Sequence, residues 1–170
     1  MKRLFLLRHA KSSWDDPALA DHERPLAKRG ERDAPRIAQR LRERHPAPSL
    51  IVTSSAERAL RTARIFAVEL GVPAAAMVVD PALYLAAPET ILAVAARQND
   101  TELSLLLVGH NPGMTDVTNR LLPHAALDNL PTAAVIGIEL ACDRWASLGD
   151  ARARLIHYDY PKNRGAPVAG

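Results

Sequence analysis

The stretch that decides the fold is Leu4-Phe5-Leu6-Leu7-Arg8-His9, at the start of the chain. Four consecutive apolar residues followed at once by polar ones are typical of a strand buried on both faces of a parallel sheet. The run is too short for the apolar core of a signal peptide. An arginine where a buried strand ends needs an anionic partner, so Arg8 and His9 are the first candidate site residues.

Strand and helix patterns then alternate along the chain. We expect helices over 27–44, from Ser54 or Ser55 to Gly71, from near Pro88, and over 114–122, and strands over 50–52, 77–79, 103–108, 133–140 and 154–158. This alternation predicts an α/β fold, a three-layer α/β/α sandwich with a mostly parallel central sheet. We expect one domain over residues 1–160 and a frayed C-terminal tail over 161–170, which is rich in Gly and Pro.

The first predicted helix has two distinct faces. Its apolar stripe is formed by Ala34, Ile37, Ala38 and Leu41, at helical spacing. Four arginines lie roughly opposite, namely Arg29, Arg32, Arg36 and Arg40. We interpret these arginines as a solvated face.

The composition favours a cytoplasmic globular protein. The chain has 170 residues, a formal net charge of +3, and a single cysteine, Cys142, which excludes an intrachain disulfide. No stretch reaches the roughly 20 apolar residues of a membrane-spanning helix, so we expect no membrane association. The pI of about 9.3 and the arginine stripe raise the alternative of a nucleic-acid binder. We expect no nucleic-acid partner, because the sequence has no aromatic platform or recognised motif.

Three candidate positions fall at the carboxyl ends of predicted strands, where sites gather in such sheets. They are Arg8-His9, Arg58 in the first turn of the second helix, and His110 after Gly109. Each is weak alone, but together they bring two histidines and two arginines to one edge. No acidic pair or Asp-rich cluster accompanies them, so we predict a phosphate site with no metal and no cofactor.

At these positions the sequence resembles the histidine phosphatase superfamily, which has the phosphoglycerate-mutase-like fold. Leu7-Arg8-His9-Ala10 resembles its Arg-His-Gly signature, the run from Ser55 to Ala63 its second arginine motif, and Gly109-His110-Asn111 its second histidine motif. The run 8–14, with Arg24-Pro25-Leu26 and Gly30, is most similar to SixA-like phosphohistidine phosphatases. The resemblance covers roughly residues 1 to 160.

The resemblance implies a role for each matching residue. His9 would be the nucleophile and would become phosphorylated, and Arg8, Arg58 and His110 would complete the phosphate pocket. Ser12 is expected to add a hydroxyl contact. Ala10 replaces the usual glycine of the signature, which requires a negative φ at this position.

A second departure concerns the general acid. Many superfamily members carry Glu or Asp in a Leu-x-Glu pattern, but the matching residues here are Leu83-Tyr84-Leu85-Ala86, which puts Leu85 at the acid position. Asp80 and Glu89 are nearby and are assigned to a turn and a helix start. Because phosphohistidine has a better leaving group than an alkyl phosphate, a site without a dedicated acid favours a phosphohistidine substrate.

The expected function is therefore a protein phosphohistidine phosphatase of SixA type with a covalent phosphohistidine intermediate on His9. Its expected partner is a phosphohistidine protein or a small phosphorylated substrate. One alternative is a broad-specificity phosphomonoesterase for small molecules. Another, from a different class, is a non-catalytic module that binds phosphoproteins. Trp14, Arg24 and Tyr84 either line the pocket or serve in packing.

Overall fold

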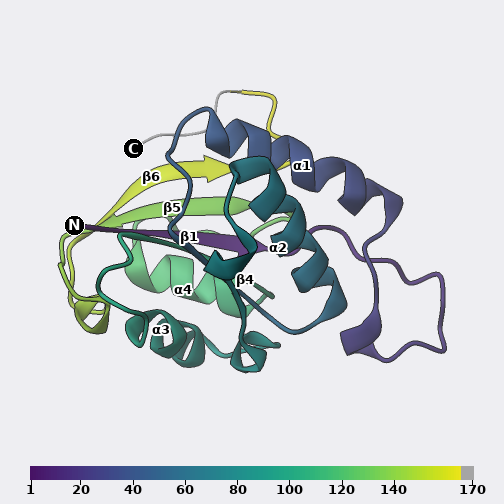
Figure 1. Ribbon diagram of the computed structural model, residues 1–170, viewed down its shortest axis with the longest axis horizontal. Helices are drawn as coiled ribbons and strands as arrows, with labels where there is room; N and C mark the ends of the chain where they lie inside the picture. The colour runs from purple at the N-terminus through teal and green to yellow at the C-terminus, as the bar shows by residue number, and fades with distance from the viewer. Residues whose placement is uncertain (166–170) are drawn as a thin grey trace.

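A computed structural model describes residues 1–165 of the chain (Figure 1). The strands are β1 (Lys2–Arg8), β2 (Leu50–Thr53), β3 (Met77–Val79), β4 (Ser104–Gly109), β5 (Val135–Leu140) and β6 (Ala153–Asp159). The helices are α1 (Lys28–Arg42), α2 (Glu57–Leu70), α3 (Pro88–Ala96) and α4 (Gly113–Leu121). The predicted elements are all present, with ends shifted by one or two residues.

The six strands form one sheet in the order β3-β2-β4-β1-β5-β6. The pairs β3–β2, β2–β4 and β4–β1 are parallel, whereas β5 runs antiparallel to both of its neighbours. The predicted mostly parallel sheet is therefore confirmed. This topology places the carboxyl ends of β1, β2 and β4 at the same edge, next to one another.

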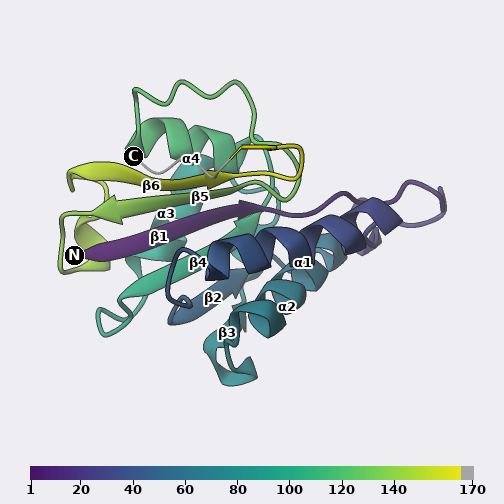
Figure 2. The same cartoon turned by 90° about the horizontal axis from the view of Figure 1, so that it is seen from above.

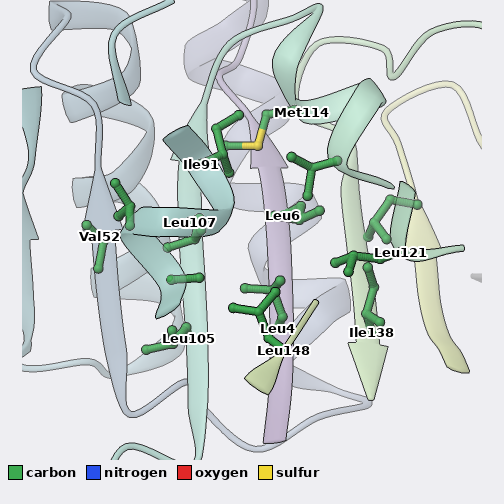
Figure 3. Packing of buried hydrophobic residues seen from close by; sticks show 14 of the residues in the cluster. Leu4, Leu6, Val52, Ile91, Leu105, Leu107, Met114, Leu121, Ile138 and Leu148 are labelled. Carbon is green, nitrogen blue, oxygen red and sulfur yellow. The ribbon is translucent and has the colours of Figure 1, made fainter. Parts of the chain in front are cut away.

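Helices cover both faces of the sheet, with α1 and α2 on one side and α3 and α4 on the other (Figure 2). Alternate residues of β1 face the two layers. Phe5 and Leu7 belong to the core under α1 and α2, and Leu4 and Leu6 to the core under α3 and α4. Figure 3 shows Leu4 and Leu6 on the same side of the sheet as Met114. Burial on both faces explains why β1 is apolar throughout rather than alternating.

The starts and ends of α2 and α3 follow from single residues, with one correction. Gly71 ends α2 with φ 71°, a left-handed conformation that favours glycine, and Pro88 stands in the first turn of α3. The expected serine cap of α2 is wrong, because the N-cap is Ala56 and no side chain caps the helix. The hydroxyls of Ser54 and Ser55 instead bond to His110 and His22.

The loop between β1 and α1 projects beyond the carboxyl end of β1 (Figures 1 and 2). Its only helical turn is the 3-10 turn Asp21–Glu23. The loop returns to the start of α1, where Ala27 N donates to the Lys11 carbonyl at 2.8 Å. A Cβ on Gly30 would lie 2.3 Å from that carbonyl oxygen, so only glycine permits this close approach. The contact fixes Lys11 against α1.

The two faces of α1 are as predicted, except at one arginine. Its apolar stripe is buried, and Arg29, Arg32 and Arg36 are exposed. Arg40 is not part of a solvated face, because it binds the fully buried carboxylate of Asp159 at 2.5 Å. Arg40 therefore ties α1 to the end of β6.

The C-terminal tail lies beside this ion pair. Asn163 Nδ2 donates to Asp159 at 3.1 Å, and the carbonyl of Asn163 accepts from Arg40. The rest of the tail that we predicted to be frayed, residues 166–170, lies outside the described residues. Within residues 1–165, no helix has the length and apolar character required to cross a bilayer.

Candidate active site

The structure brings together three of the predicted site residues. His9 follows β1, Arg58 lies in the first turn of α2 after β2, and His110 follows β4. Arg58 Nε lies 3.3 Å from His9 Nε2, and Arg58 Nη2 lies 3.4 Å from His110 Nδ1. The two imidazole centroids are 5.1 Å apart. His9, Arg58 and His110 are only 7%, 3% and 2% exposed, so the cluster is buried at the sheet edge.

The hydrogen bonds of each imidazole define which nitrogen carries the proton. His9 Nδ1 lies 2.8 Å from the carbonyl oxygen of Ala10, so Nδ1 is the donor and Nε2 keeps its lone pair. Arg58 always donates, so His110 Nδ1 accepts from it, and His110 Nε2 donates to Ser54 Oγ at 2.8 Å. Each ring therefore turns an unprotonated nitrogen toward the Arg58 guanidinium.

Burial and the surrounding arginines keep both imidazoles neutral. Burial, together with the charges of Arg58, Arg8 and Arg24, lowers the pKa of His9 to about 4, although its bond to Ala10 acts in the opposite direction. Burial and the nearby His9 and Arg58 lower the pKa of His110 to about 3. A neutral imidazole with a free lone pair is a nucleophile at neutral pH.

One carboxylate reaches this cluster, which the sequence analysis did not predict. Asp21, in the 3-10 turn of the loop after β1, accepts from Arg58 Nη2 at 2.9 Å and from the Tyr84 hydroxyl at 2.6 Å. Its second oxygen accepts from Arg24 Nη1 at 3.0 Å. These donors, Tyr84 first and then Arg58 and Arg24, hold the pKa of Asp21 well below its usual range. Asp21 is therefore ionised and placed as an anion between two guanidinium groups.

Arg8 is oriented differently from the other three predicted residues. Its Nη1 donates to the Leu130 carbonyl at 2.6 Å, and that oxygen also accepts from Asn111 Nδ2 at 3.0 Å. Among residues 1–165, Arg8 forms no hydrogen bond to His9, Arg58 or His110, and its buried Nε has no hydrogen-bond partner. Its charge is nevertheless close enough to contribute to the lowered pKa of His9.

Within residues 1–165, the Ser12 side chain is linked to the cluster through Arg24 alone. Its hydroxyl accepts from Arg24 Nη2 at 2.5 Å, and the same guanidinium bonds to Asp21 and to the Ser13 carbonyl. The exposed Trp14 ring stacks on Arg24, with the guanidinium carbon 3.2 Å from the ring centroid. Ser12 and Trp14 therefore orient Arg24 in this structure.

Two further residues at the site carried little signal in the sequence. The sequence predicts Ser54 as a helix cap, but its hydroxyl accepts a hydrogen bond from His110 Nε2 instead. Tyr84, left open between pocket and packing, points its hydroxyl at Asp21 and packs its ring against His110, with centroids 5.5 Å apart. Its position next to Leu85, the place expected for an acid, is the only hint that the sequence offered.

Leu85, at the expected acid position, and the nearby Asp80 and Glu89 form no hydrogen bond with His9, Arg58 or His110 within residues 1–165, and the two acids lie in a turn and a helix start as predicted. Leu85 is exposed with φ 47°. Asp80 accepts from Ala82 N in a 3-10 turn and pairs with Arg97, and Glu89 pairs with Arg120 from the first turn of α3. Asp21 is therefore the carboxylate that contacts Arg58 within residues 1–165.

The backbone at the signature accommodates alanine. Ala10 is fully buried, and it does not have a positive φ, as the replacement of glycine requires. Its N–H donates to Thr62 Oγ1 at 3.0 Å, which links the end of β1 to α2. Within residues 1–165, no group of three His, Cys, Asp or Glu side chains is arranged to hold a metal ion. The chemistry available here is that of neutral imidazoles and guanidinium groups, which suits an oxyanion.

Comparisons with known proteins agree with this geometry. The family model of the histidine phosphatase superfamily, branch 1, matches residues 4–84. An uncharacterised chloroplast protein of Arabidopsis thaliana is 35% identical over 128 residues, which cover 71% of this chain and 59% of that protein. An uncharacterised protein of Mycobacterium tuberculosis is 32% identical over 165 residues, 92% of this chain and 100% of that protein.

A solved structure extends the similarity over nearly the whole fold. The proposed phosphohistidine phosphatase SixA of Agrobacterium tumefaciens has a TM-score of 0.80 and 32% identity, covering 94% of this chain and 98% of that chain. With the three motifs, the sheet topology and the buried His-Arg-His cluster, these matches identify the family. The chain belongs to the histidine phosphatase superfamily.

Proposed function

We propose that this protein is a phosphohistidine phosphatase of SixA type, which transfers the phosphoryl group to His9 Nε2 and then to water. The observation that carries the proposal is the state of His9. Its Nδ1–H is bound to the Ala10 carbonyl, its Nε2 lone pair faces Arg58, and burial keeps the ring unprotonated. A buried histidine held in this way is prepared for attack on phosphorus.

In the first step, Nε2 bonds to phosphorus in line with the bond to the leaving nitrogen, which breaks. His9 keeps its Nδ1 proton, so the phosphorylated ring carries a positive charge. The Ala10 carbonyl, 2.8 Å from Nδ1, stabilises that charge. The leaving imidazole of the substrate departs with its own proton, which is why an acid at position 85 is not required.

The transferred group carries its charge on the equatorial oxygens, and cationic donors stabilise it there. Arg58 is the central donor, because its guanidinium lies between His9 and His110. We assign Arg24 and His110 to the same group, and Arg8 to the positive potential around it. One such donor is worth roughly 2.7–4 kcal/mol of barrier in comparable enzymes.

In the second step, water adds to phosphorus as the bond to His9 Nε2 breaks. The products are inorganic phosphate and the neutral His9 ring, and the water proton leaves on the phosphate or to solvent. The positive charge on phosphorylated His9 makes the ring a good leaving group, so hydrolysis also proceeds without a carboxylic acid. Asp21, held ionised, does not donate a proton in either step.

A labelling experiment tests the nucleophile. Wild-type protein mixed with a ³²P-phosphohistidine protein should form an acid-labile phosphoenzyme in a burst, and His9→Ala should form none. His124→Ala is the matched control, because His124 is exposed and has no hydrogen bond within residues 1–165. Hydrolysis by His9→Ala at the wild-type rate would refute the covalent mechanism. Binding without turnover by the wild type would instead favour a phosphoprotein-binding module.

A substrate panel tests the phosphohistidine assignment. The phosphohistidine protein is compared with phosphoserine peptides and sugar phosphates under the same conditions. We expect the highest kcat/KM with phosphohistidine, because the site supplies no acid for an alkoxide leaving group. Faster hydrolysis of the esters would refute the assignment and support the broad phosphomonoesterase instead.

A further inference from the structure

A cavity of about 500 Å³ lies beside the cluster, between the start of α1 and the ends of β1 and β6. We call it the arginine cavity. Among residues 1–165, six cationic side chains line it, namely Arg8, Lys11, Arg29, Arg32, Arg36 and Lys162, and Asp33 is the only acidic residue of the lining. His9, Arg58 and His110 are not part of the lining, so the cavity is a second positively charged feature next to the site.

Most of these cations lack an internal counter-charge. Arg32 pairs with Asp33 at 3.2 Å, and Arg8 bonds to the Leu130 carbonyl. Within residues 1–165, Lys11, Arg29, Arg36 and Lys162 form no ion pair. Other arginines of the chain do find acids, such as Arg61 with Glu31 and Arg97 with Asp80. Cations gathered in a hollow without neutralising partners attract an external anion.

The spacing of the arginines indicates what kind of anion fits. Arg29, Arg32 and Arg36 are three and four residues apart on one face of α1, so they span about 10 Å along the helix at its 1.5 Å rise per residue. A single phosphate group is too short to engage all three. Several carboxylates spaced along a polypeptide match this row, because guanidinium groups pair with carboxylates in a bidentate manner.

The position of the cavity connects it with the reaction. Arg8 precedes His9 at the end of β1, and Lys11 follows two residues after it, held against α1 by the contact with Gly30. A polypeptide bound in the cavity therefore contacts Arg8 and Lys11, which are one and two positions from the nucleophile in the chain. A small phosphorylated molecule bound at His9 would leave the row on α1 unused.

We propose that the arginine cavity docks an acidic segment of the phosphoprotein substrate, near its phosphohistidine. This inference rests on the proposed function and adds a determinant of substrate choice to it. Electrostatic complementarity of this kind raises the association rate and discriminates among partners. The cavity then selects acidic phosphoproteins, while the chemistry at His9 is the same for every phosphohistidine.

The test uses two peptides that carry phosphohistidine and differ only in charge. One has three glutamates at spacings of three and four residues, and the other has glutamines at the same positions. Each peptide is made in two arrangements, with the glutamate or glutamine segment either before or after the phosphohistidine. For the wild-type protein at low salt we expect kcat/KM at least about 10-fold higher for the glutamate peptide in one of the two arrangements. The advantage should shrink as salt is raised.

The variant Arg29→Glu/Arg36→Glu should abolish this advantage, because it reverses two exposed cations that have no ion pair within residues 1–165. Its kcat/KM for the glutamine peptide should stay within about twofold of wild type, which also shows that it is folded. Arg152→Glu is the control for a charge reversal at an exposed arginine outside the cavity. Arg152 is exposed and precedes β6, whose first residue pairs with Leu140 at the end of the sheet far from His9.

Three results would overturn the proposal. They are equal kcat/KM for both peptides with the wild type, an equal loss for both peptides in the double variant, and the same loss in Arg152→Glu. Failure of the proposed function gives a different result, since the wild type would then hydrolyse neither phosphohistidine peptide while cleaving phosphate esters. That outcome also removes the docking proposal.

Discussion

Replacing Asp21 by asparagine should tighten phosphate binding. In this structure the Asp21 carboxylate bonds to Arg58 Nη2 and Arg24 Nη1, the donors that we assign to the phosphoryl group in the proposed mechanism. A phosphate bound by Arg58 would sit close to Asp21 and be repelled by it. Asp21→Asn keeps the shape of the side chain and removes its charge. The backbone carbonyl of Asp21, which also accepts from Arg58 at 2.6 Å, remains in the variant.

The magnitude follows from the exposure of this carboxylate. Two unit charges about 5 Å apart repel by roughly 1–2 kcal/mol at an effective dielectric constant of about 40–80. We use this range because the Asp21 side chain is 42% exposed and water screens its charge. The repulsion corresponds to about 5- to 30-fold tighter binding of phosphate in the variant.

Isothermal titration with inorganic phosphate at neutral pH measures the effect. The matched control is Glu23→Gln, which removes the same charge from the same 3-10 turn; among the described residues 1–165, the Glu23 side chain accepts only from Ala20 N. We expect the phosphate Kd of this control to stay within about twofold of wild type. Unchanged or weaker phosphate binding in Asp21→Asn would refute the reasoning, because Asp21 would then be needed to position the arginines. An equal gain in Glu23→Gln would attribute the effect to net charge alone.

Three further predictions concern the buried histidines and their partners. Because burial lowers the pKa of His9 to about 4, an NMR titration should find its ring neutral down to about pH 5. The value of kcat/KM, corrected for substrate ionisation, should then be constant from pH 5 to 7. A titration midpoint of His9 near pH 6.5 would contradict this prediction. Ser54→Ala leaves His110 Nε2–H without its acceptor, so urea unfolding should show a loss of about 1–3 kcal/mol, and no loss would mean that the bond contributes nothing. His157 is a buried residue of β6. Its pKa, like those of His9 and His110, is lowered mainly by burial, so below about pH 6.5 the unfolded chain binds more protons than the folded one. The free energy of unfolding should therefore be highest above that pH and decrease toward pH 4, by roughly 1 kcal/mol per pH unit for each histidine. A urea midpoint that does not change between pH 6.5 and 4.5 would exclude this.

The sequence was sufficient to predict that three of the candidate residues, His9, Arg58 and His110, lie together at one edge of the sheet. Apolar runs marked the strands, and His9, Arg58 and His110 each follow one of them. Parallel strands end at a shared edge, so the meeting of these residues follows from topology alone. In the structure all three residues are buried, and the Arg58 guanidinium lies 3.3 Å from His9 Nε2 and 3.4 Å from His110 Nδ1, in agreement with that topology.

The path of the loop after β1 could not be predicted in the same way. Residues 11–27 have no periodic pattern, and their course depends on tertiary contacts such as the bridge between Ser12 and Leu26. The close approach of Gly30 to Lys11 is another. These contacts bring Asp21 and Arg24 over the cluster. The direction of Arg8 was likewise hidden, because it depends on the Leu130 carbonyl, distant in sequence.

The structure changes the argument about the general acid without reversing its outcome. We expected no acidic pair near the cluster, and a single carboxylate, Asp21, lies in it. A carboxylic acid serves as a proton donor only if its pKa is raised by burial or by like charges. Asp21 has the opposite surroundings, because Tyr84, Arg58 and Arg24 all stabilise its ionised form. Within residues 1–165, the carboxylate that contacts Arg58 is therefore not placed to protonate an alkoxide leaving group, which supports the proposed phosphohistidine substrate.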